Sequence, residues 1–481
     1  IPKTGARLAS NTKAALDRSS QSKVFYLDNK WWAIAQDAVD SKWYLWSFNG
    51  GAWSRDLLVD SRAGARADMI VDVANKKLFV LGSQSASAIF FRLGYNAGNW
   101  TIEKQTTLAD FAHGTGANVV TMTRAKNNAL WVFRINNNVL ETQVSKDNGA
   151  TWSATIPIKS GLPGVKGQTE AVTFSASGNH VGVFYSLINT NSGKLFGFMK
   201  HLDTDLNNKW TDETNSIARF GTETPEGSLC AGVTNSGVVY VMTRTIPTAP
   251  DDPNNTLYKR SATGAWTKFI VNIGYDWASP ALALDASNNR LYLMGIRASS
   301  TPNIGEYVSV AFGQESTIID AFAPVFMKNA AHNFANLSAP ATPVTSATGL
   351  MMLAGNTTTD EVWFSRIALG LPKAAEEERL ATSQQEVEID KFTEASVYPN
   401  PFNPSTTIRF AVKEPMQVKL QIFNLRGELV RTLANGEHKR GLHEKHWNGH
   451  DHTGNLVASG VYFFRLQIGE QFYRGRMQMV K

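Results

Sequence analysis

Residues 67–105 read ADMIVDVANKKLFVLGSQSASAIFFRLGYNAGNWTIEKQ. Three strand-sized runs, at 67–73, 77–82 and 88–95, are separated by turn-forming residues, and a fourth run begins at Trp100. Short runs of alternating or continuous apolar residues between such turns predict β-strands. Four short antiparallel strands make one blade of a β-propeller, so this stretch predicts one blade.

The turn that ends in Trp100 recurs along the first 370 residues. Its copies are Gly51-Ala52-Trp53, Gly98-Asn99-Trp100, Ala150-Thr151-Trp152, Asn208-Lys209-Trp210 and Gly264-Ala265-Trp266. These Trp residues are 47, 52, 58 and 56 residues apart, a repeat length typical of propeller blades. The four-strand pattern also fits residues 22–60, 116–158, 170–215, 227–272 and 279–322, whereas 338–367 shows only three strands.

The sequence therefore predicts an all-β fold in which residues 22–370 form a seven-bladed β-propeller. The missing strand of the last blade could come from the N-terminal segment, residues 1–21, and close the ring, although residues 7–15 are poor strand formers. Six blades with an irregular segment are the alternative. We expect the five Trp residues at equivalent positions of successive blades, and the first strands, which are rich in small residues, at the crowded centre.

The third repeat contains the motif Ser145-Lys146-Asp147-Asn148-Gly149-Ala150-Thr151-Trp152. It resembles the Asp-box of sialidase-like propellers, Ser-x-Asp-x-Gly-x-Thr-Trp, at every fixed position. The resemblance implies a structural hairpin turn in which Asp147 accepts backbone N–H groups, Gly149 has a positive φ and Trp152 packs between blades. It implies no activity, because the arginine triad and the Tyr nucleophile of sialidases cannot be located in this sequence.

The last 85 residues, 397–481, have a different character. Their motifs are Tyr398-Pro399-Asn400-Pro401-Phe402-Asn403-Pro404, Ile422-Phe423-Asn424-Leu425-Arg426-Gly427, Trp447-Asn448-Gly449-His450-Asp451 and Ala458-Ser459-Gly460-Val461-Tyr462. In order and spacing they resemble the type A sorting domain of the type IX (Por) secretion system. The resemblance implies an immunoglobulin-like sandwich of about seven strands that interacts with the secretion machinery and is often cleaved after export. Whether this copy is retained, anchored differently or left unprocessed stays open.

Composition and charge narrow the possible functions. Residues 371–396 form an acidic linker without the blade repeat, and the net charge of +6 lies mostly in residues 397–481, which hold 12 Lys and Arg against 6 Asp and Glu. The basic residues are not clustered with aromatic or helical readers, which argues against a nucleic-acid partner.

No apolar run approaches the roughly 20 residues of a membrane span. The chain begins at Ile1, as a mature protein would, and we expect a secreted or cell-surface location after passage through the periplasm.

No cofactor and no metal site are predicted. Cys230 is the only cysteine and lies in an apolar run, so we expect it in the core rather than as a reactive thiol. His443, His446, His450 and His452 lack a compact ligand spacing, and Asp251-Asp252, in a loop rich in Pro and Asp, is a weak cation candidate.

Candidate ligand-binding residues lie in the loops between blades, because these loops must emerge at one mouth of the ring. They are Arg62, Arg66, His113, Lys166, Arg219, Glu226, Tyr275, Asp276 and Trp277. Cations beside flat aromatic rings suit an acidic glycan or another anionic surface component.

Three functions remain open. The leading interpretation is a non-catalytic binding or structural module, possible ligands being acidic polysaccharides. The first alternative is a carbohydrate-active enzyme, for which His113, Glu226, Tyr275 and Asp276 are candidates, although none lies in a catalytic motif. The second alternative is a subunit of an extracellular surface or filament assembly.

Overall fold

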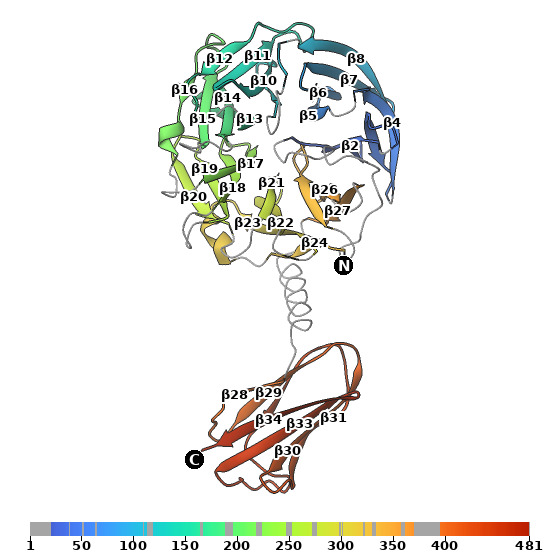
Figure 1. Cartoon of the computed structure of the whole chain (residues 1–481), viewed down its shortest axis with the longest axis vertical. Helices are drawn as coiled ribbons and strands as arrows, with labels where there is room; N and C mark the ends of the chain where they lie inside the picture. Colours follow the sequence, from blue (N-terminus) through green and yellow to red (C-terminus); the bar gives the residue numbers. More distant parts are fainter. Residues whose placement is uncertain are drawn as a thin grey trace. The chain divides into compact units, whose positions relative to one another are not determined.

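The computed structural model describes residues 21–37, 39–50, 52–62, 65–108, 110–112, 119–163, 167–187, 196–217, 224–246, 253–271, 277–297, 300, 302–320, 323–329, 333–356, 361–369 and 395–480. The chain divides into two compact units, residues 1–370 and 371–481. Almost all regular structure in the described ranges is β-strand (Figure 1). No helix in those ranges is long and apolar enough to cross a membrane.

The first unit is a ring of seven antiparallel sheets, or blades, arranged around a central axis (Figure 1). Blade 1 contains β1 (Val24–Leu27), β2 (Lys30–Gln36), β3 (Trp43–Phe48) and β4 (Trp53–Asp60). Blade 2 contains β5 (Arg66–Asp72), β6 (Lys77–Ser83), β7 (Ala88–Asn96) and β8 (Asn99–Leu108). Blade 3 contains β9 (Thr121–Arg124), β10 (Leu130–Asn136), β11 (Val139–Ser145) and β12 (Ile156–Lys159).

The next blades repeat this order. Blade 4 contains β13 (Gly167–Ala176), β14 (Gly178–Leu187), β15 (Phe196–Leu202) and β16 (Thr211–Asp212), followed by the 3-10 helix η1 (Thr214–Ser216). Blade 5 contains β17 (Thr224–Val233), β18 (Val239–Ile246), β19 (Asn255–Arg260) and β20 (Trp266–Ile270). Blade 6 contains β21 (Trp277–Asp285), β22 (Arg290–Arg297), β23 (Ile304–Ala311), the 3-10 helix η2 (Glu315–Asp320) and β24 (Val325–Met327).

Blade 7 has three described strands, β25 (Phe334–Ser338), β26 (Leu350–Asn356) and β27 (Glu361–Ile367). The prediction of a seven-bladed propeller is therefore confirmed, and the six-bladed alternative is wrong. The first strand of each blade lies nearest the axis (Figure 1), where small residues such as Ala281 and Ala283 of β21 are almost completely buried. Cys230 on β17 is also buried, as expected, and burial raises the pKa of its thiol well above the usual value.

The five Trp residues of the repeated turn occupy equivalent positions, at or just before the fourth strand of blades 1 to 5. Each ring packs against an aromatic ring of the preceding blade. The pairs and their centroid distances are Trp53–Phe364 at 6.0 Å, Trp100–Trp32 at 5.8 Å, Trp152–Phe90 at 5.4 Å, Trp210–Trp131 at 5.6 Å and Trp266–Phe198 at 5.5 Å. Such pairs contribute roughly 0.5–1.5 kcal/mol each beyond the area they bury, so the repeated Trp joins blade to blade.

Backbone contacts between β1 and the segment after β25 also close the ring. Val24 forms a parallel bridge with Pro340, and the Val24 carbonyl accepts the N–H of Ala341 at 2.8 Å. The backbone N–H of Lys23 donates to Ser338 Oγ at 3.0 Å. Together with the Trp53–Phe364 contact, these bonds join blade 1 to blade 7. The proposed closing strand in residues 1–20 lies outside the described residues.

The turn after β11 is held by the side chains that the motif predicts. Asp147 accepts the backbone N–H of Thr151 at 2.9 Å and its hydroxyl at 2.6 Å, and these bonds lower the pKa of Asp147 to about 2. Ser145 Oγ donates to Asp147 and accepts the N–H of Gly149 at 2.8 Å. Gly149 has φ +84°, and a Cβ there would lie 1.9 Å from the Phe90 ring. The turn therefore requires glycine both for its backbone and for its contact with blade 2.

The second unit is a β-sandwich. A three-stranded sheet contains β28 (Ser396–Tyr398), β29 (Thr406–Val412) and β32 (Gly441–Trp447), and a four-stranded sheet has the order β31 (Leu429–His438), β30 (Met416–Asn424), β33 (Gly460–Ile468), β34 (Gln471–Met479). Alternating residues of both sheets, among them Phe410, Trp447 and Phe464, form one buried core. This confirms the predicted immunoglobulin-like sandwich.

Candidate functional site

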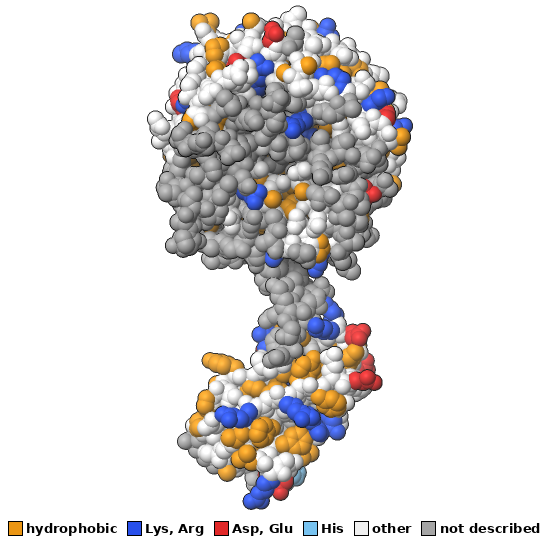
Figure 2. All heavy atoms as spheres, in the orientation of Figure 1, with side chains coloured by type: hydrophobic (Ala, Val, Ile, Leu, Met, Phe, Trp, Pro, Cys, Tyr) orange, Lys and Arg blue, Asp and Glu red, His pale blue; other side chains and the backbone are white. Residues whose placement is uncertain are grey.

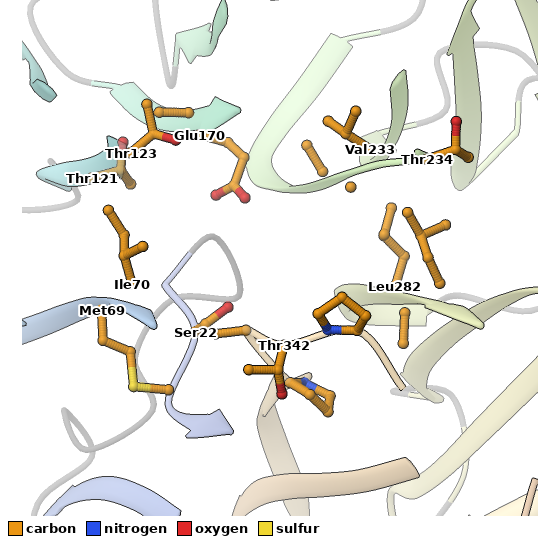
Figure 3. Close-up of a pocket in the computed structure, with 18 of the residues that line it drawn as sticks. Ser22, Met69, Ile70, Thr121, Thr123, Glu170, Val233, Thr234, Leu282 and Thr342 are labelled. Carbon is orange, nitrogen blue, oxygen red and sulfur yellow. The ribbon is translucent and has the colours of Figure 1, made fainter. Parts of the chain in front are cut away.

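A cavity of about 270 Å³ lies at the centre of the propeller (Figure 3). Its walls come mainly from the first strands of blades 2 to 6, namely β5, β9, β13, β17 and β21, and from residues 340–343. Polar side chains such as Thr121, Thr123 and Glu170 are mixed with apolar ones such as Ile70, Val233 and Leu282 along the wall (Figure 3). Such a lining suits a small molecule that has both hydroxyl groups and an apolar face.

Two carboxyl groups from different blades line this cavity. Asp68 on β5 is 4% exposed and accepts the backbone N–H of Met122 on β9 at 2.8 Å. Burial raises the pKa of Asp68 to about 7, and the positive charge of Lys23 partly opposes that shift. Glu170 on β13 directs its carboxyl group into the cavity (Figure 3), and its Oε2 is buried without a hydrogen-bond partner among the described residues. Burial, and then the negative charge of Asp68, raise the pKa of Glu170 well above its usual value.

Lys23 is the cation of this cluster and is 1% exposed. Its ammonium group donates to the carbonyls of Ala67 at 2.5 Å and Gln21 at 3.2 Å, and to Gln21 Oε1 at 3.4 Å. The amide of Gln21 in turn donates to the carbonyl of Val120 at 2.9 Å. The segment before β1 therefore joins blade 1 to blades 2 and 3 at the axis. We name Lys23, Asp68 and Glu170 the axial cluster.

The axial cluster can supply a proton or a hydrogen bond. A carboxyl group that stays protonated near neutral pH is a donor, which an ordinary carboxylate is not. Among the described residues, no group of three or more His, Cys, Asp or Glu could hold a metal ion. The mixed polar and apolar lining of the cavity favours a small polar ligand.

Sequence reasoning missed the axial cluster. Asp68 stands between Ala67 and Met69, and Glu170 between Thr169 and Ala171, in the first strands of their blades. The signal in the sequence was a carboxylate residue within a strand that the repeat places at the axis of the ring. The three members are separated by up to 147 residues of sequence, so only the ring brings them together.

Most of the predicted mouth residues lie where the structure gives no side-chain description. His113, Lys166, Arg219, Tyr275 and Asp276 are outside the described residues. Glu226 belongs to β17, and its side chain is not described. In the sequence these residues precede or belong to the first strands of successive blades. Because each blade is a meander that starts at the axis, those described first strands all begin at one end of the ring.

The described mouth residues do not line the axial cavity. Arg62 pairs with Asp60, at 2.6 Å from Nη2 to Oδ2, and also donates to the carbonyl of Gly82 at 2.8 Å, so it joins blades 1 and 2. Arg66 begins β5, and its carbonyl accepts the hydroxyl of Ser83 at 3.3 Å. Neither arginine is part of the cavity wall.

The prediction that Trp277 stacks on a ligand is wrong for this structure. Trp277 is completely buried, and its indole N–H donates to Glu306 Oε2 at 3.0 Å. Its ring fills the space above Gly295 of β22, where a Cβ would lie 2.5 Å from the Trp277 side chain. From the sequence alone, a tryptophan at the first position of a strand cannot be distinguished from an exposed tryptophan in the preceding loop. In the structure, the ring of Trp277 packs into the blade.

Comparison with known proteins supports both folds. Residues 402–470 match the family model of the FlgD Ig-like domain. The propeller is similar in fold to an ulvan lyase of polysaccharide lyase family PL25 bound to -[GlcA(1-4)Rha3S]-, with a TM-score of 0.55 and 10% identity over 79% of this chain and 99% of that chain. Another structure of a PL25 ulvan lyase gives a TM-score of 0.54 and 11% identity with the same coverage. No curated protein sequence matches this chain.

Proposed function

We propose that this chain is an extracellular β-propeller that binds an acidic polysaccharide without cleaving it. The supporting observation is the arrangement of the blades. The described first strands all start at the same end of the ring, and Lys166, Arg219 and Tyr275 precede three of them in the sequence, so we infer a shared binding site at that end. Cations and an aromatic ring at one mouth suit carboxylate or sulfate groups on sugars.

The fold comparison adds a ligand class to this proposal. The similar ulvan lyase was solved with a ligand that contains glucuronic acid and sulfated rhamnose. We propose an anionic glycan of this chemical kind as the ligand, held at the mouth. The axial cavity would accept a single sugar unit through Glu170 and the nearby Thr hydroxyl groups.

The second unit has its own proposed role. The match to the FlgD Ig-like domain supports a β-sandwich, while the sequence motifs support a sorting domain of type IX secretion. We propose that residues 397–481 interact with that machinery. Deleting them should leave the propeller folded inside the cell and abolish its appearance outside. Export of the truncated chain at the normal level would remove the proposal.

Binding is tested with the whole chain on a panel containing ulvan, polygalacturonate and neutral dextran. We expect binding to the two acidic polymers, weakening as salt rises. The double substitution Lys166→Ser and Arg219→Ser should weaken it about three- to tenfold, since exposed charge pairs contribute little singly. The matched control is Lys126→Ser with Lys146→Ser, two exposed lysines in turns at the other end of blade 3. Equal losses in both double variants would contradict a site at the mouth.

A polysaccharide lyase is the second candidate, favoured by the two lyase structures of similar fold. A base such as His113 or Tyr275 would remove the C5 proton of a uronate, and the sugar attached at O4 would leave. The product carries a C4–C5 double bond that absorbs ultraviolet light. Incubation with ulvan and polygalacturonate separates the candidates, because a binding protein produces no such absorbance.

A further inference from the structure

The four-stranded sheet of the second unit has one face in the core and one face outside. Val418, Leu420 and Ile422 of β30 are buried, so alternate residues point outward. The register places the outward residues in three rows across the sheet. The rows are Leu429, Phe423, Phe463 and Arg476; then Thr432, Gln421, Arg465 and Arg474; then Asn435, Lys419, Gln467 and Phe472. We name these twelve positions the outer face.

The outer face carries four cations and no carboxylate. The only acidic residue on the four strands is Glu437, one row beyond, on the edge strand β31. Among the described residues, no ion pair involves Lys419, Arg465, Arg474 or Arg476. In the other sheet, by contrast, Arg409 lies 3.4 Å from Glu444. Four cations without an ion pair lie on one face and repel one another, and a bound anion would relieve this repulsion.

Aromatic side chains are interleaved with these cations. Phe463 is 39% exposed and Phe472 is 55% exposed. Arg465 stacks over Phe423 at 5.0 Å, and its guanidinium donates to Gln421 at 2.9 Å, which fixes its position on the sheet. Figure 2 shows hydrophobic and basic side chains next to each other on this part of the second unit. A guanidinium held in this way is prepared for a planar anion such as a carboxylate.

We propose that the outer face is a second binding site for an acidic polysaccharide. Phe463 and Phe472 lie on either side of the row that contains Arg465 and Arg474. Phe472 pairs with Gln467, which is four residues from Phe463 on β33, a separation of roughly 13 Å along the strand. A linear glycan of a few units could lie across the face, with sugar rings on the two phenyl groups. Its acid groups would then meet Arg465 and Arg474. This inference takes its ligand class from the proposed function, but the site is separate from the mouth.

The distribution of polar groups favours a glycan over a lipid surface. The row with Arg465 and Arg474 separates Phe472 from the row that contains Phe463, and that row itself ends in Arg476. Inserting both phenyl groups into hydrocarbon would therefore carry charged side chains with them, which is unfavourable. Gln467 and Asn435 offer hydrogen bonds to hydroxyl groups, which lipid chains lack.

The test uses the full chain and compares affinity for polygalacturonate, polyglutamate, neutral dextran and anionic phospholipid vesicles. Arg474→Ser with Arg476→Ser should weaken binding to polygalacturonate about three- to tenfold. The matched control is Lys413→Ser with Lys439→Ser, which removes two exposed charges from turns of the same unit. Phe472→Ala should weaken binding to polygalacturonate but leave binding to polyglutamate unchanged, because only a sugar ring stacks on phenylalanine.

Each outcome decides for or against the outer face. Equal effects of the face and control variants would overturn the site. Polyglutamate binding as tight as polygalacturonate, with no effect of Phe472→Ala, would show a general anion surface and overturn the glycan. Vesicle binding abolished by Phe472→Ala would assign the face to membranes instead. The mouth variant Lys166→Ser with Arg219→Ser, measured in parallel, reports separately on the propeller, so failure of one site is distinguishable from failure of the other.

Discussion

Two carboxyl groups of the propeller, Glu170 at the axis and Glu213 between blades 4 and 5, have opposite pKa shifts. Glu170 has an unpartnered buried oxygen and a carboxylate nearby, so its pKa is raised. Glu213 is also desolvated, but it accepts two bonds from Arg260, at 2.8 and 2.9 Å, and lies 2.8 Å from Lys200. Desolvation raises the pKa of Glu213, but its two cations outweigh this and lower the pKa to about 2.

The ring accommodates buried carboxyl groups in two ways, by pairing them with cations or by raising their pKa. Between blades 4 and 5, Glu213 has two cations that keep it ionised, so it holds these two blades together. At the axis, one lysine faces two carboxyl groups, so the site is short of positive charge. The interface therefore gains stability from ionisation, whereas the axis gains stability from protonation. Stability should fall at both ends of the pH range for different reasons.

The largest effect is expected from Lys23→Met. It removes the only cation of the axial cluster and leaves three hydrogen bonds to oxygen unmade. Breaking a buried charge pair destabilises a protein by roughly 3–5 kcal/mol. The loss should be larger at pH 8 than at pH 5, because Asp68, with a pKa of about 7, is mostly protonated at pH 5. Denaturant unfolding at both pH values measures it, with the exposed Lys76→Met as control; equal losses at the two pH values would contradict the pairing.

Glu213→Gln should destabilise the propeller by roughly 3 kcal/mol at pH 7, from a shift of the pKa from 4.5 to about 2. Because the folded pKa is lowered, this stability is present above pH 4.5 and is lost as the pH falls through about 2. Wild type and variant should therefore converge in acid. Glu103→Gln is the control: Glu103 also lies between two cations, Lys77 and Arg92, but is 30% exposed, so its loss should be under about 1 kcal/mol.

The sequence predicted the interfaces between blades far better than the axis. The Trp turns are local patterns of four to eight residues, and their packing against the preceding blade follows from the repeat alone. The axial cluster joins Lys23, Asp68 and Glu170 from three blades, and neither their proximity nor their burial is visible in any one repeat. The prediction that Trp277 binds a ligand was wrong for a related reason. The direction of its side chain depends on Gly295 and Glu306 of the neighbouring strands.

Glu170→Gln should make the propeller more stable at pH 8 and leave its stability unchanged at pH 4. Folding favours the protonated form of Glu170, because burial and then the negative charge of Asp68 raise its folded pKa well above the unfolded value. The wild-type contribution is therefore complete below about pH 4.5 and is lost as pH rises, whereas glutamine carries no proton to lose. Thermal midpoints from pH 4 to 8 should diverge by several degrees at the upper end. Parallel curves would show that Glu170 stays ionised at the axis.

The smallest effects are expected from two exposed turns that share one chemistry, one in each unit. Asp147 accepts the N–H and hydroxyl of Thr151, and Asp451 accepts the N–H of Thr453 at 2.9 Å and its hydroxyl at 2.7 Å. In both cases these bonds lower the pKa of the carboxyl group, so each turn should persist well into acid. Asp→Asn keeps one acceptor oxygen, and we expect a shift of no more than a few degrees from either substitution.

The measurement that distinguishes the two turns is which unit's thermal unfolding transition shifts in temperature. Each unit has its own core, so calorimetry should resolve two transitions. Asp147→Asn should shift only the transition of the propeller and speed hydrogen exchange at the amides of Gly149 and Thr151, because their acceptors lie in that turn. Asp451→Asn should shift only the transition of the second unit. If one substitution moved both transitions together, the two units would unfold as one, and the stability of the propeller would depend on the domain we assign to secretion.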